Sequence, residues 1–265
     1  MNGAQTIIKF LEDKKAETIF GYPGGAVLTL YDALYDSSLN HILTRHEQGA
    51  IHAAEGYARS TGRTGVVFAT SGPGATNLIT GLSDANLDSV PLFVITGQVV
   101  APTIGTDAFQ EADMRGITIP VTKHNYLVSK ASDLPSILEE AWWIAESGRP
   151  GPVLIDVPKN IFAAEIPDGT PVEVKLPRVR RKQFTLEEQL GGITEALRHS
   201  YRPLILAGGG ITISHGGKQA LHALIEKFNI PCAVTLMGKA NITEEHPLAL
   251  GMAGMHGMPA ANTAM

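Results

Sequence analysis

A single acidic residue stands where a predicted strand gives way to a predicted helix. The segment Arg45-His46-Glu47-Gln48 follows the apolar run His41–Thr44 and precedes a helix rich in small residues. A carboxylate at such a junction projects from the strand end toward any ligand that the sheet binds. In a dry site, burial would raise its proton affinity and suit it to acid–base chemistry. Alternatively, Glu47 only complements the dipole at the helix N-terminus, where acidic residues are common.

Glycine and proline gather in three other segments that follow predicted strands. These are Gly21-Tyr22-Pro23-Gly24-Gly25, Ser71-Gly72-Pro73-Gly74 and Gly97-Gln98. Parallel α/β sheets bind ligands at the carboxyl ends of their strands, where loops cross into helices. Gly24 and Gly25 would let the backbone approach a reacting centre without a Cβ in the way. A simple turn from strand to helix is the other interpretation of these glycines.

The elements that must position these loops alternate along the first half of the chain. Short apolar runs predict strands at Thr18–Phe20, His41–Thr44, Val66–Thr70, Leu92–Thr96, Tyr126–Ser129 and Val153–Val157. Helices are predicted over the first fifteen residues, with Ile7, Ile8, Phe10 and Leu11 facing inward, and near Leu28–Tyr35, Gln48–Arg59, Ala75–Leu87 and Leu134–Ser147. Strands that alternate with helices of this length predict an α/β fold with a parallel sheet covered on both faces.

The alternation lapses between Ala163 and Gln183, where prolines and mixed charges indicate an interdomain linker. We therefore expect a first domain at residues 1–162, a linker at 163–184 and a second α/β unit at 185–265. The second unit is predicted from a capping box, Thr185-Leu-Glu-Glu188, the strands Pro203–Ala207 and Cys232–Leu236, and a helix near Lys218–Phe228. Two or three strands with no closing element are too few for a complete domain. We expect the chain to be part of a longer protein.

Composition excludes several classes of protein. The formal charge of −5 argues against a nucleic-acid surface, and the one basic cluster, Arg178–Lys182, lies in the predicted linker. The single cysteine excludes an internal disulfide and suits a reducing cytoplasm. No apolar run approaches the roughly 20 residues that span a bilayer, and no secretory signal is present, so we expect a cytoplasmic protein without membrane contact.

Other catalytic patterns are weak or absent. The nine histidines include no pair with zinc spacing, so no metal ligand is predicted in this chain. Ser71 lacks the G-x-S-x-G elbow of hydrolases. Asn241-Ile242-Thr243 fits a glycosylation sequon, but nothing else indicates secretion. Gly208-Gly209-Gly210 does not extend to a dinucleotide fingerprint, because the third glycine position falls at Ile213 and Phe228-Asn229-Ile230 occupies the place where an acid is required.

Four motifs occur together and in order: Tyr22-Pro23-Gly24-Gly25, Arg45-His46-Glu47-Gln48, Ser71-Gly72-Pro73-Gly74-Ala75-Thr76-Asn77 and Gly148-Arg149-Pro150-Gly151-Pro152-Val153. This set resembles the pyrimidine-binding domain of thiamine-diphosphate enzymes of the acetolactate synthase and pyruvate oxidase group. The resemblance covers residues 1–160 and continues to the end of the chain. Thr106–Glu111 and Thr122–Tyr126 resemble the biosynthetic acetolactate synthases in particular, so the second unit is expected to be part of a flavin-type central domain.

The resemblance implies specific roles for the candidate residues. Glu47 would hydrogen-bond the aminopyrimidine of thiamine diphosphate and favour its imino tautomer, whose imine removes the proton from the thiazolium C2. The family's catalytic positions correspond to Glu47, Gly25 and Gln110. The expected thiamine-diphosphate contacts are Tyr22, Pro23, Gly24, Gly25, Glu47, Pro73, Gly74, Asn77 and Gln110. Phe109 and Lys159 correspond to substrate positions, although Lys159 is equally compatible with a solvated surface lysine.

A second group of residues corresponds to flavin contacts in the family. These are Arg149, Gly208, Gly209, Gly210, Gly251, Met252, His256 and Gly257. FAD has no redox part in the main reaction of the family and is expected to be structural. Without the resemblance, the glycine triplet indicates only a close backbone approach to some ligand.

The implied activity is that of an acetolactate synthase large subunit in branched-chain amino-acid biosynthesis. It would decarboxylate pyruvate and transfer the hydroxyethyl group to a second pyruvate or to 2-ketobutyrate. The family's Mg²⁺ and diphosphate site has no counterpart here, so this chain alone is expected to be inactive. Partners implied are a second copy, as a homodimer or tetramer, and a small regulatory subunit. Another thiamine-diphosphate enzyme, such as a pyruvate oxidase, and a non-catalytic binding module remain alternatives.

Overall fold

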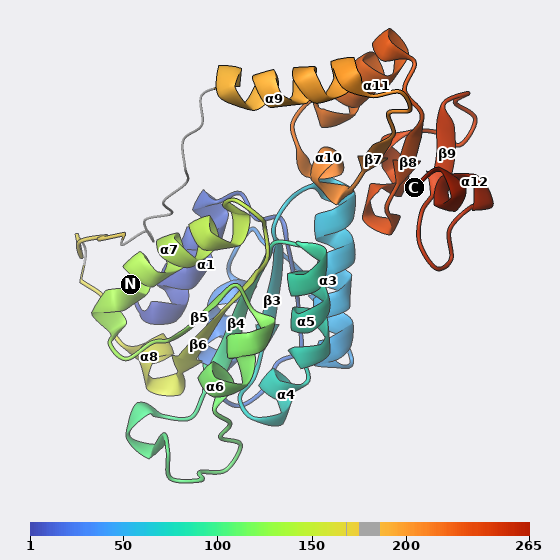
Figure 1. Ribbon diagram of the computed structural model, residues 1–265. Helices are drawn as coiled ribbons and strands as arrows, with labels where there is room; N and C mark the ends of the chain where they lie inside the picture. The colour runs from blue at the N-terminus through green and yellow to red at the C-terminus, as the bar shows by residue number, and fades with distance from the viewer. Residues whose placement is uncertain (168, 175–185) are drawn as a thin grey trace. The chain divides into compact units, whose positions relative to one another are not determined.

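A computed structural model describes residues 1–167, 169–174 and 186–265. The chain divides into two compact units, Met1–Pro177 and Arg178–Met265. Each unit contains its own parallel sheet with helices packed against it (Figure 1). Two features predicted from the sequence, the cluster Arg178–Lys182 and the cap at Thr185, lie outside the described residues.

The first unit is built on a six-stranded sheet in which every pairing is parallel. Its strands are β1 (Thr18–Gly21), β2 (Asn40–Leu43), β3 (Gly65–Ala69), β4 (Leu92–Gln98), β5 (His124–Leu127) and β6 (Pro152–Pro158). Their spatial order is β2-β1-β3-β4-β6-β5. The predicted α/β class and parallel sheet are therefore confirmed. The predicted strand at Tyr126–Ser129 begins two residues too late, because pairing with β6 starts at His124 opposite Val153.

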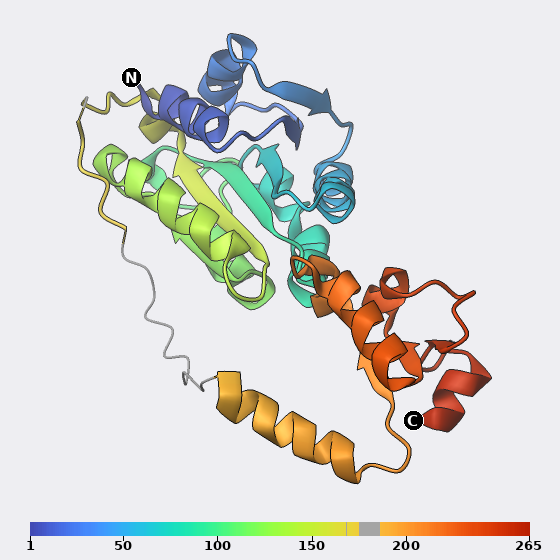
Figure 2. The ribbon, with the colours of Figure 1, turned by 90° about the horizontal axis from the view of Figure 1, so that it is seen from above.

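Helices cover both faces of this sheet, as Figures 1 and 2 show. They are α1 (Gly3–Asp13), α2 (Leu28–Tyr35), α3 (Glu47–Thr61), α4 (Pro73–Thr76), α5 (Ile79–Asp88), α6 (Met114–Thr118), α7 (Leu134–Glu146) and α8 (Lys159–Ala163). Short 3-10 turns lie at Ala101–Thr103, Ile119–Val121 and Ala131–Asp133. The small helices α6 and α8 and these turns are too short to produce a periodic signal, which explains why the sequence did not predict them.

The two faces of the sheet belong to two apolar layers. In β3, Val66 and Phe68 pack in the layer formed with α1, α2, α7 and α8, whereas Val67 and Ala69 pack in the layer formed with α3, α4, α5 and α6. This alternation follows from the period of two in a strand. Because both faces are buried, the central strands are continuous apolar runs, as is typical of parallel sheets.

The N-terminal helix α1 forms as the sequence predicts. Asn2 caps it by accepting a hydrogen bond from the Gln5 backbone amide at 2.9 Å, and the Gln5 side chain accepts from the Asn2 amide at 3.0 Å. This reciprocal pair satisfies two donors that a helix start leaves free. The predicted inward residues Ile7, Ile8, Phe10 and Leu11 are all buried. Trp142 also lies in this layer, at 5.9 Å from the Phe10 ring.

One predicted helix is divided in two. The sequence predicts a continuous helix at Ala75–Leu87, but α4 ends at Thr76 and α5 begins at Ile79. The backbone tightens here, because the Leu78 amide donates to the Ala75 carbonyl at 3.1 Å, three residues back. The break leaves Asn77 in the connection between the two helices.

The second unit contains a three-stranded parallel sheet, in the order β7-β8-β9. Its elements are α9 (Leu186–His199), β7 (Ile205–Ala207), α10 (Gly209–Ile213), α11 (Gly217–Phe228), β8 (Cys232–Val234), a 3-10 segment at Leu236–Asn241, β9 (Ala249–Met252) and α12 (Pro259–Ala264). The expectation of no closing element was wrong, since β9 pairs with β8 and α12 packs beside it. The predicted strand Cys232–Leu236 ends early because Thr235 caps the 3-10 segment, accepting from the Gly238 amide at 3.2 Å.

None of the helices in the described part of the chain has the length and apolar character needed to cross a bilayer. The sequon residue Asn241 is 1% exposed. Its side-chain amide donates to the Gly208 carbonyl at 2.9 Å, and its Oδ1 accepts from the Thr212 hydroxyl at 2.8 Å. Asn241 is therefore a buried structural residue and not an accessible glycosylation site.

The packing of α3 on α5 gives a direct test of the fold. A Cβ added at Gly81 would lie 2.2 Å from Cγ2 of the buried Ile51, so Gly81→Ala must displace a core side chain. We expect a loss of about 1–3 kcal/mol in the free energy of unfolding. Urea titration followed by tryptophan fluorescence reports this unit, because Trp142 and Trp143 both belong to it.

Gly56→Ala in α3 is the matched control for this test. A Cβ at Gly56 has no atom within 4 Å, so the change should leave stability unchanged or raise it by up to about 1 kcal/mol. Equal destabilisation by the two variants would contradict the packing described for α3 and α5.

Candidate functional site

The loops that the sequence singled out meet at one edge of the first sheet. Strands β2, β1 and β3 are neighbours and parallel, so their carboxyl ends lie side by side. The segments that follow them are Tyr22–Gly25 after β1, Arg45–Glu47 after β2 and Ser71–Gly74 after β3. The loop after β4 leaves from the same edge and lies at the bottom of Figure 1.

Glu47 is the first residue of α3 and its side chain is buried, with 7% exposure. His46 caps this helix, because its Nδ1 accepts a hydrogen bond from the Gln48 amide at 3.1 Å. Glu47 Oε2 accepts from Asn77 Nδ2 at 3.0 Å. The break between α4 and α5 therefore has a clear consequence, since it directs an amide donor to the buried carboxylate of Glu47.

The second oxygen of Glu47 lies beside backbone. A Cβ added at Gly74 would come within 3.0 Å of Glu47 Oε1 and 2.7 Å of Thr70 Cγ2. Thr70 also fills the space beside Gly24, where a Cβ would lie 2.5 Å from Thr70 Cβ. Its hydroxyl accepts from the Ala26 amide at 3.3 Å. Thr70 thus joins the loops after β1 and β3, and only glycine fits on either side of it.

The remaining predicted contacts of this edge differ in exposure. Tyr22, Pro23, Gly25 and Pro73 are exposed, and a Cβ at Gly25 would meet no atom within 4 Å. Glu47 thus lies under a group of exposed or open positions. This arrangement provides a buried carboxyl beside an accessible surface, as a ligand-binding edge requires.

Phe109 and Gln110 lie on the long loop between β4 and α6. Phe109 is 88% exposed, and the Gln110 backbone has φ of +61°. A Cβ at Gly72 would come within 2.5 Å of the Gln110 carbonyl oxygen, so this loop rests on the loop that carries Pro73 and Gly74. Lys159 is exposed at the start of α8, directly after β6.

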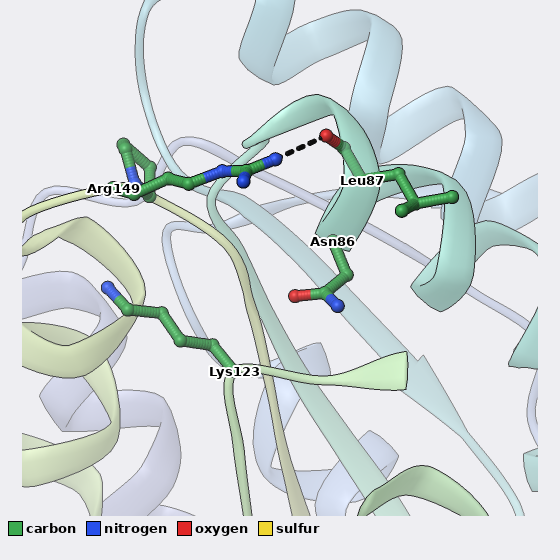
Figure 3. A pocket seen from close by; sticks show the side chains of 5 residues that line it. Asn86, Leu87, Lys123 and Arg149 are labelled. Carbon is green, nitrogen blue, oxygen red and sulfur yellow. Dashed lines mark hydrogen bonds between the residues drawn. The ribbon is translucent and has the colours of Figure 1, made fainter. Parts of the chain in front are cut away.

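Arg149 lies at the opposite, amino-terminal edge of the sheet, because it precedes β6. Its Nη2 donates to the Leu87 carbonyl at 2.6 Å, as Figure 3 shows. Its Nε donates to Ser89 Oγ at 2.6 Å. Arg149 and Lys123 both line a pocket at this edge. Lys123 also donates to the carbonyls of Ile144 and Ser147. Burial lowers the pKa of Lys123. The structure therefore separates Arg149 from the Glu47 edge.

The glycines of the second unit also gather at one edge. Gly208, Gly209 and Gly210 follow β7, and Gly251 and Met252 end β9, so both segments lie at the carboxyl ends of a parallel sheet. His256 and Gly257 lie in the turn that follows β9. A Cβ at Gly257 would meet the Met252 carbonyl at 2.4 Å. This is the edge where such a sheet binds ligands.

Histidines 222 and 246 meet Glu226 in the second unit, with possible ligand atoms within 4.8 Å of one another. His222 Nε2 donates to the Asn241 carbonyl at 3.2 Å. His246 Nδ1 accepts from the Leu248 amide at 3.1 Å, so its Nε2 carries the proton and faces Glu226 Oε1 at 3.8 Å. These contacts engage Nε2 of His222 and both ring nitrogens of His246, and we assign no metal to the group.

Several buried polar residues near the Glu47 edge were not predicted. Tyr31 OH and His41 Nε2 are buried without a hydrogen-bond partner among the described residues, and their rings meet edge to face at 5.2 Å. Burial, and then the charge of Glu47, raise the pKa of Tyr31. Asp156 was also missed, although an acid inside the apolar run of β6 is a signal that the sequence contains.

Comparison with known proteins identifies the architecture. Residues 1–117 match the N-terminal TPP binding domain of thiamine pyrophosphate enzymes, and residues 190–265 match the central domain of the same enzymes. The chain belongs to the thiamine pyrophosphate enzyme family. This finding confirms the resemblance drawn from the motifs around Glu47 and assigns the two units to two successive domains of one kind of enzyme.

Relatives in this family are similar over the whole chain. It is 50% identical to the acetolactate synthase large subunit of Lactococcus lactis over 265 residues, which are 100% of this chain and 46% of the relative. It is 51% identical over 268 residues to a probable acetolactate synthase large subunit of Methanocaldococcus jannaschii, covering 100% of this chain and 45% of the relative. It is 49% identical to the acetolactate synthase large subunit of Corynebacterium glutamicum over 262 residues, which are 98% of this chain and 42% of the relative. The chain spans about half the length of these curated relatives.

The geometry at Glu47 fits a thiamine pyrophosphate enzyme. Among the described residues, Asn77 is the hydrogen-bond donor to the Glu47 carboxylate, and it uses only Oε2. Oε1 accepts no hydrogen bond among the described residues and stands beside the bare backbone of Gly74. A buried carboxyl with one committed oxygen and one available oxygen suits a heterocyclic nitrogen.

A double-mutant cycle tests the contact that orients this carboxyl. Glu47→Ala and Asn77→Ala should show a coupling of about 1 kcal/mol in the free energy of unfolding, because each single change already removes the shared hydrogen bond. The pair Glu55→Ala and Asn77→Ala is the control, since Glu55 lies on the same helix and bonds His52 instead. Additivity of the Glu47 pair to within about 0.3 kcal/mol would show that the contact does not form.

Proposed function

We propose that residues 1–162 form the pyrimidine-binding half of the active site of an acetolactate synthase. The observation that carries the proposal is the buried Glu47 carboxyl at the carboxyl edge of the sheet, with Asn77 bonded to one oxygen. The enzyme would decarboxylate pyruvate and pass the two-carbon unit to a second 2-keto acid, either pyruvate or 2-ketobutyrate. Residues 163–184 would be the linker, and 185–265 part of the flavin-type central domain.

Thiamine diphosphate, when bound, supplies a carbon nucleophile and an electron sink for decarboxylation. Glu47 would hold or donate a proton at a ring nitrogen of its aminopyrimidine through Oε1. The Glu47 side chain is only 7% exposed. This burial suits the task, because a group that transfers a proton works best where water does not compete. Asn77 would keep Oε2 occupied, so that only one oxygen faces the cofactor.

The remaining contacts would come from the loops around Glu47. Gly24 and Gly74 would present bare backbone to the ring, and Thr70 leaves no room for a Cβ at either position. Tyr22, Pro23, Gly25 and Pro73 would border the cofactor from exposed positions. Gln110 would face the thiamine diphosphate as a catalytic residue, and Phe109 and Lys159 would face the 2-keto acid.

FAD would occupy the edge formed by Gly208–Gly210, Gly251, Met252, His256 and Gly257. Its support is their common place at the carboxyl ends of β7 and β9. Arg149 would contact the flavin with the part of its guanidinium that its bonds to Leu87 and Ser89 leave accessible. No residue of this chain is assigned to Mg²⁺.

The active assembly would be a cytoplasmic homodimer or tetramer, with a small regulatory subunit as a further partner. Support for self-association comes from α3, where Gly49 is exposed and Ala53 is only partly buried in the single chain. Small side chains on such a face allow another helix to approach closely.

Product analysis of the full-length protein tests this function. With pyruvate, thiamine diphosphate, Mg²⁺ and FAD, we expect 2-acetolactate, and 2-aceto-2-hydroxybutyrate when 2-ketobutyrate is added. The 265-residue chain alone is the control and is expected to form neither product. Oxygen-dependent formation of acetyl phosphate would instead identify a pyruvate oxidase. If the full-length protein did not turn over pyruvate at all, a binding module would be favoured.

A further inference from the structure

The loop between β4 and α6, residues 99–113, is organised by hydrogen bonds of its own. Glu111 Oε1 accepts from the Gly105 amide at 2.5 Å, and Oε2 accepts from the Ala108 amide at 3.0 Å. These backbone donors, Gly105 first, lower the pKa of Glu111. Asp107 and Gln110 have φ of +57° and +61°, which side-chain-bearing residues adopt only when their surroundings hold them.

One buried amide connects the two ends of this loop. Gln98, the last residue of β4, is 3% exposed. Its Oε1 accepts from the Val99 amide at 2.8 Å, and its Nε2 donates to the Ala112 carbonyl at 2.8 Å. Val99 begins the loop and Ala112 lies near its end, so a single side chain ties both ends together.

Asp156 on β6 sets the direction of that amide. Its Oδ2 accepts from Gln98 Nε2 at 2.8 Å, and its Oδ1 accepts from the Thr96 hydroxyl at 2.7 Å. If the Gln98 amide were reversed, its oxygen would face both the Asp156 carboxylate and the Ala112 carbonyl. Both contacts would then join two acceptors, so Asp156 permits one orientation only.

This arrangement does not depend on the charge of Asp156. Burial raises the pKa of the Asp156 carboxyl to about 7. A proton on Oδ1 can be donated to Thr96, because a hydroxyl both donates and accepts. Oδ2 then remains an acceptor for Gln98 in either protonation state.

We propose that Gln98 and Asp156 are positioning residues that fix the loop 99–112, and through it the place of Phe109 and Gln110 beside Gly72. The loop touches the Glu47 edge at Gly72, where the Gln110 carbonyl leaves no room for a Cβ. Gly72 has φ of +57° and is followed by Pro73 and Gly74, so a shift of the loop would reach that edge. The assignment of the loop to 2-keto acid binding rests on the proposed function, whereas the clamp itself does not.

Hydrogen–deuterium exchange on the full-length protein tests the clamp without any activity. Gln98→Met keeps the volume and removes all three hydrogen bonds, and Asp156→Leu removes the acceptor that orients the amide. Both should speed exchange of residues 99–112 by about tenfold relative to β3. Asp156→Asn should stay within about threefold of wild type, because its carbonyl can face Gln98 while its NH₂ donates to Thr96.

Thr96→Val is the matched control. It removes a hydrogen bond from the same carboxyl but leaves the Gln98 amide and both loop ends in contact. Unchanged loop exchange in Gln98→Met, or an equal increase in Thr96→Val, would overturn the proposal.

Steady-state kinetics separate the clamp from the function. In Gln98→Met we expect KM for pyruvate to rise by about tenfold and kcat to change less, since the loop and not Glu47 has been loosened. A fall in kcat alone would contradict the assignment to substrate positioning. If wild-type protein makes no acetolactate, the proposed function fails, while the exchange result still decides whether the clamp exists.

Discussion

The structure of the first unit depends on where one carboxyl group is placed. Glu47 begins α3 at the carboxyl edge of a parallel sheet, buried and bonded to Asn77 at 3.0 Å. A buried acid without partners would be costly, and this one has an amide donor and the N-terminal dipole of a long helix to stabilise it. The glycines around it follow from the packing of Thr70, because a Cβ at Gly24 or Gly74 would meet that side chain, and at Gly74 it would also meet Glu47 Oε1.

The layers of the fold explain how residues distant in sequence reach this edge. Strands β2, β1 and β3 are adjacent, so three loops separated by tens of residues end side by side. Strands β4 and β6 are also adjacent, with Thr96 opposite Asp156 in the register. That pairing places the Gln98 amide on Asp156 and fixes the base of the loop that reaches Gly72. The Glu47 edge thus depends on the neighbouring strands β2, β1 and β3, and the loop after β4 depends on the pair β4 and β6.

Local patterns in the sequence were sufficient to predict the strands of the first sheet and the position of Glu47. The apolar runs predicted all six strands, of which β3, β4 and β6 are buried along their whole length and the edge strands β2 and β5 are largely exposed or half-buried. The strand-to-helix junction predicted the position of Glu47. The break at Asn77 and the Gln98–Asp156 contact could not be predicted. Both depend on side chains that meet across long separations, 30 and 58 residues, which no local period records. The helix α12 was missed because its single turn and a half is too short for a periodic signal.

The most direct test of the account is exchange of the C2 proton of thiamine diphosphate bound to the full-length protein, measured by NMR after acid quench. Glu47→Gln should slow exchange by about 10²–10⁴-fold, the range expected for loss of a positioned acid–base group. Glu55→Gln, a change of a buried acid further along α3, should leave the rate near that of wild type. Exchange in Glu47→Gln as fast as in wild type would contradict the role assigned to this carboxyl.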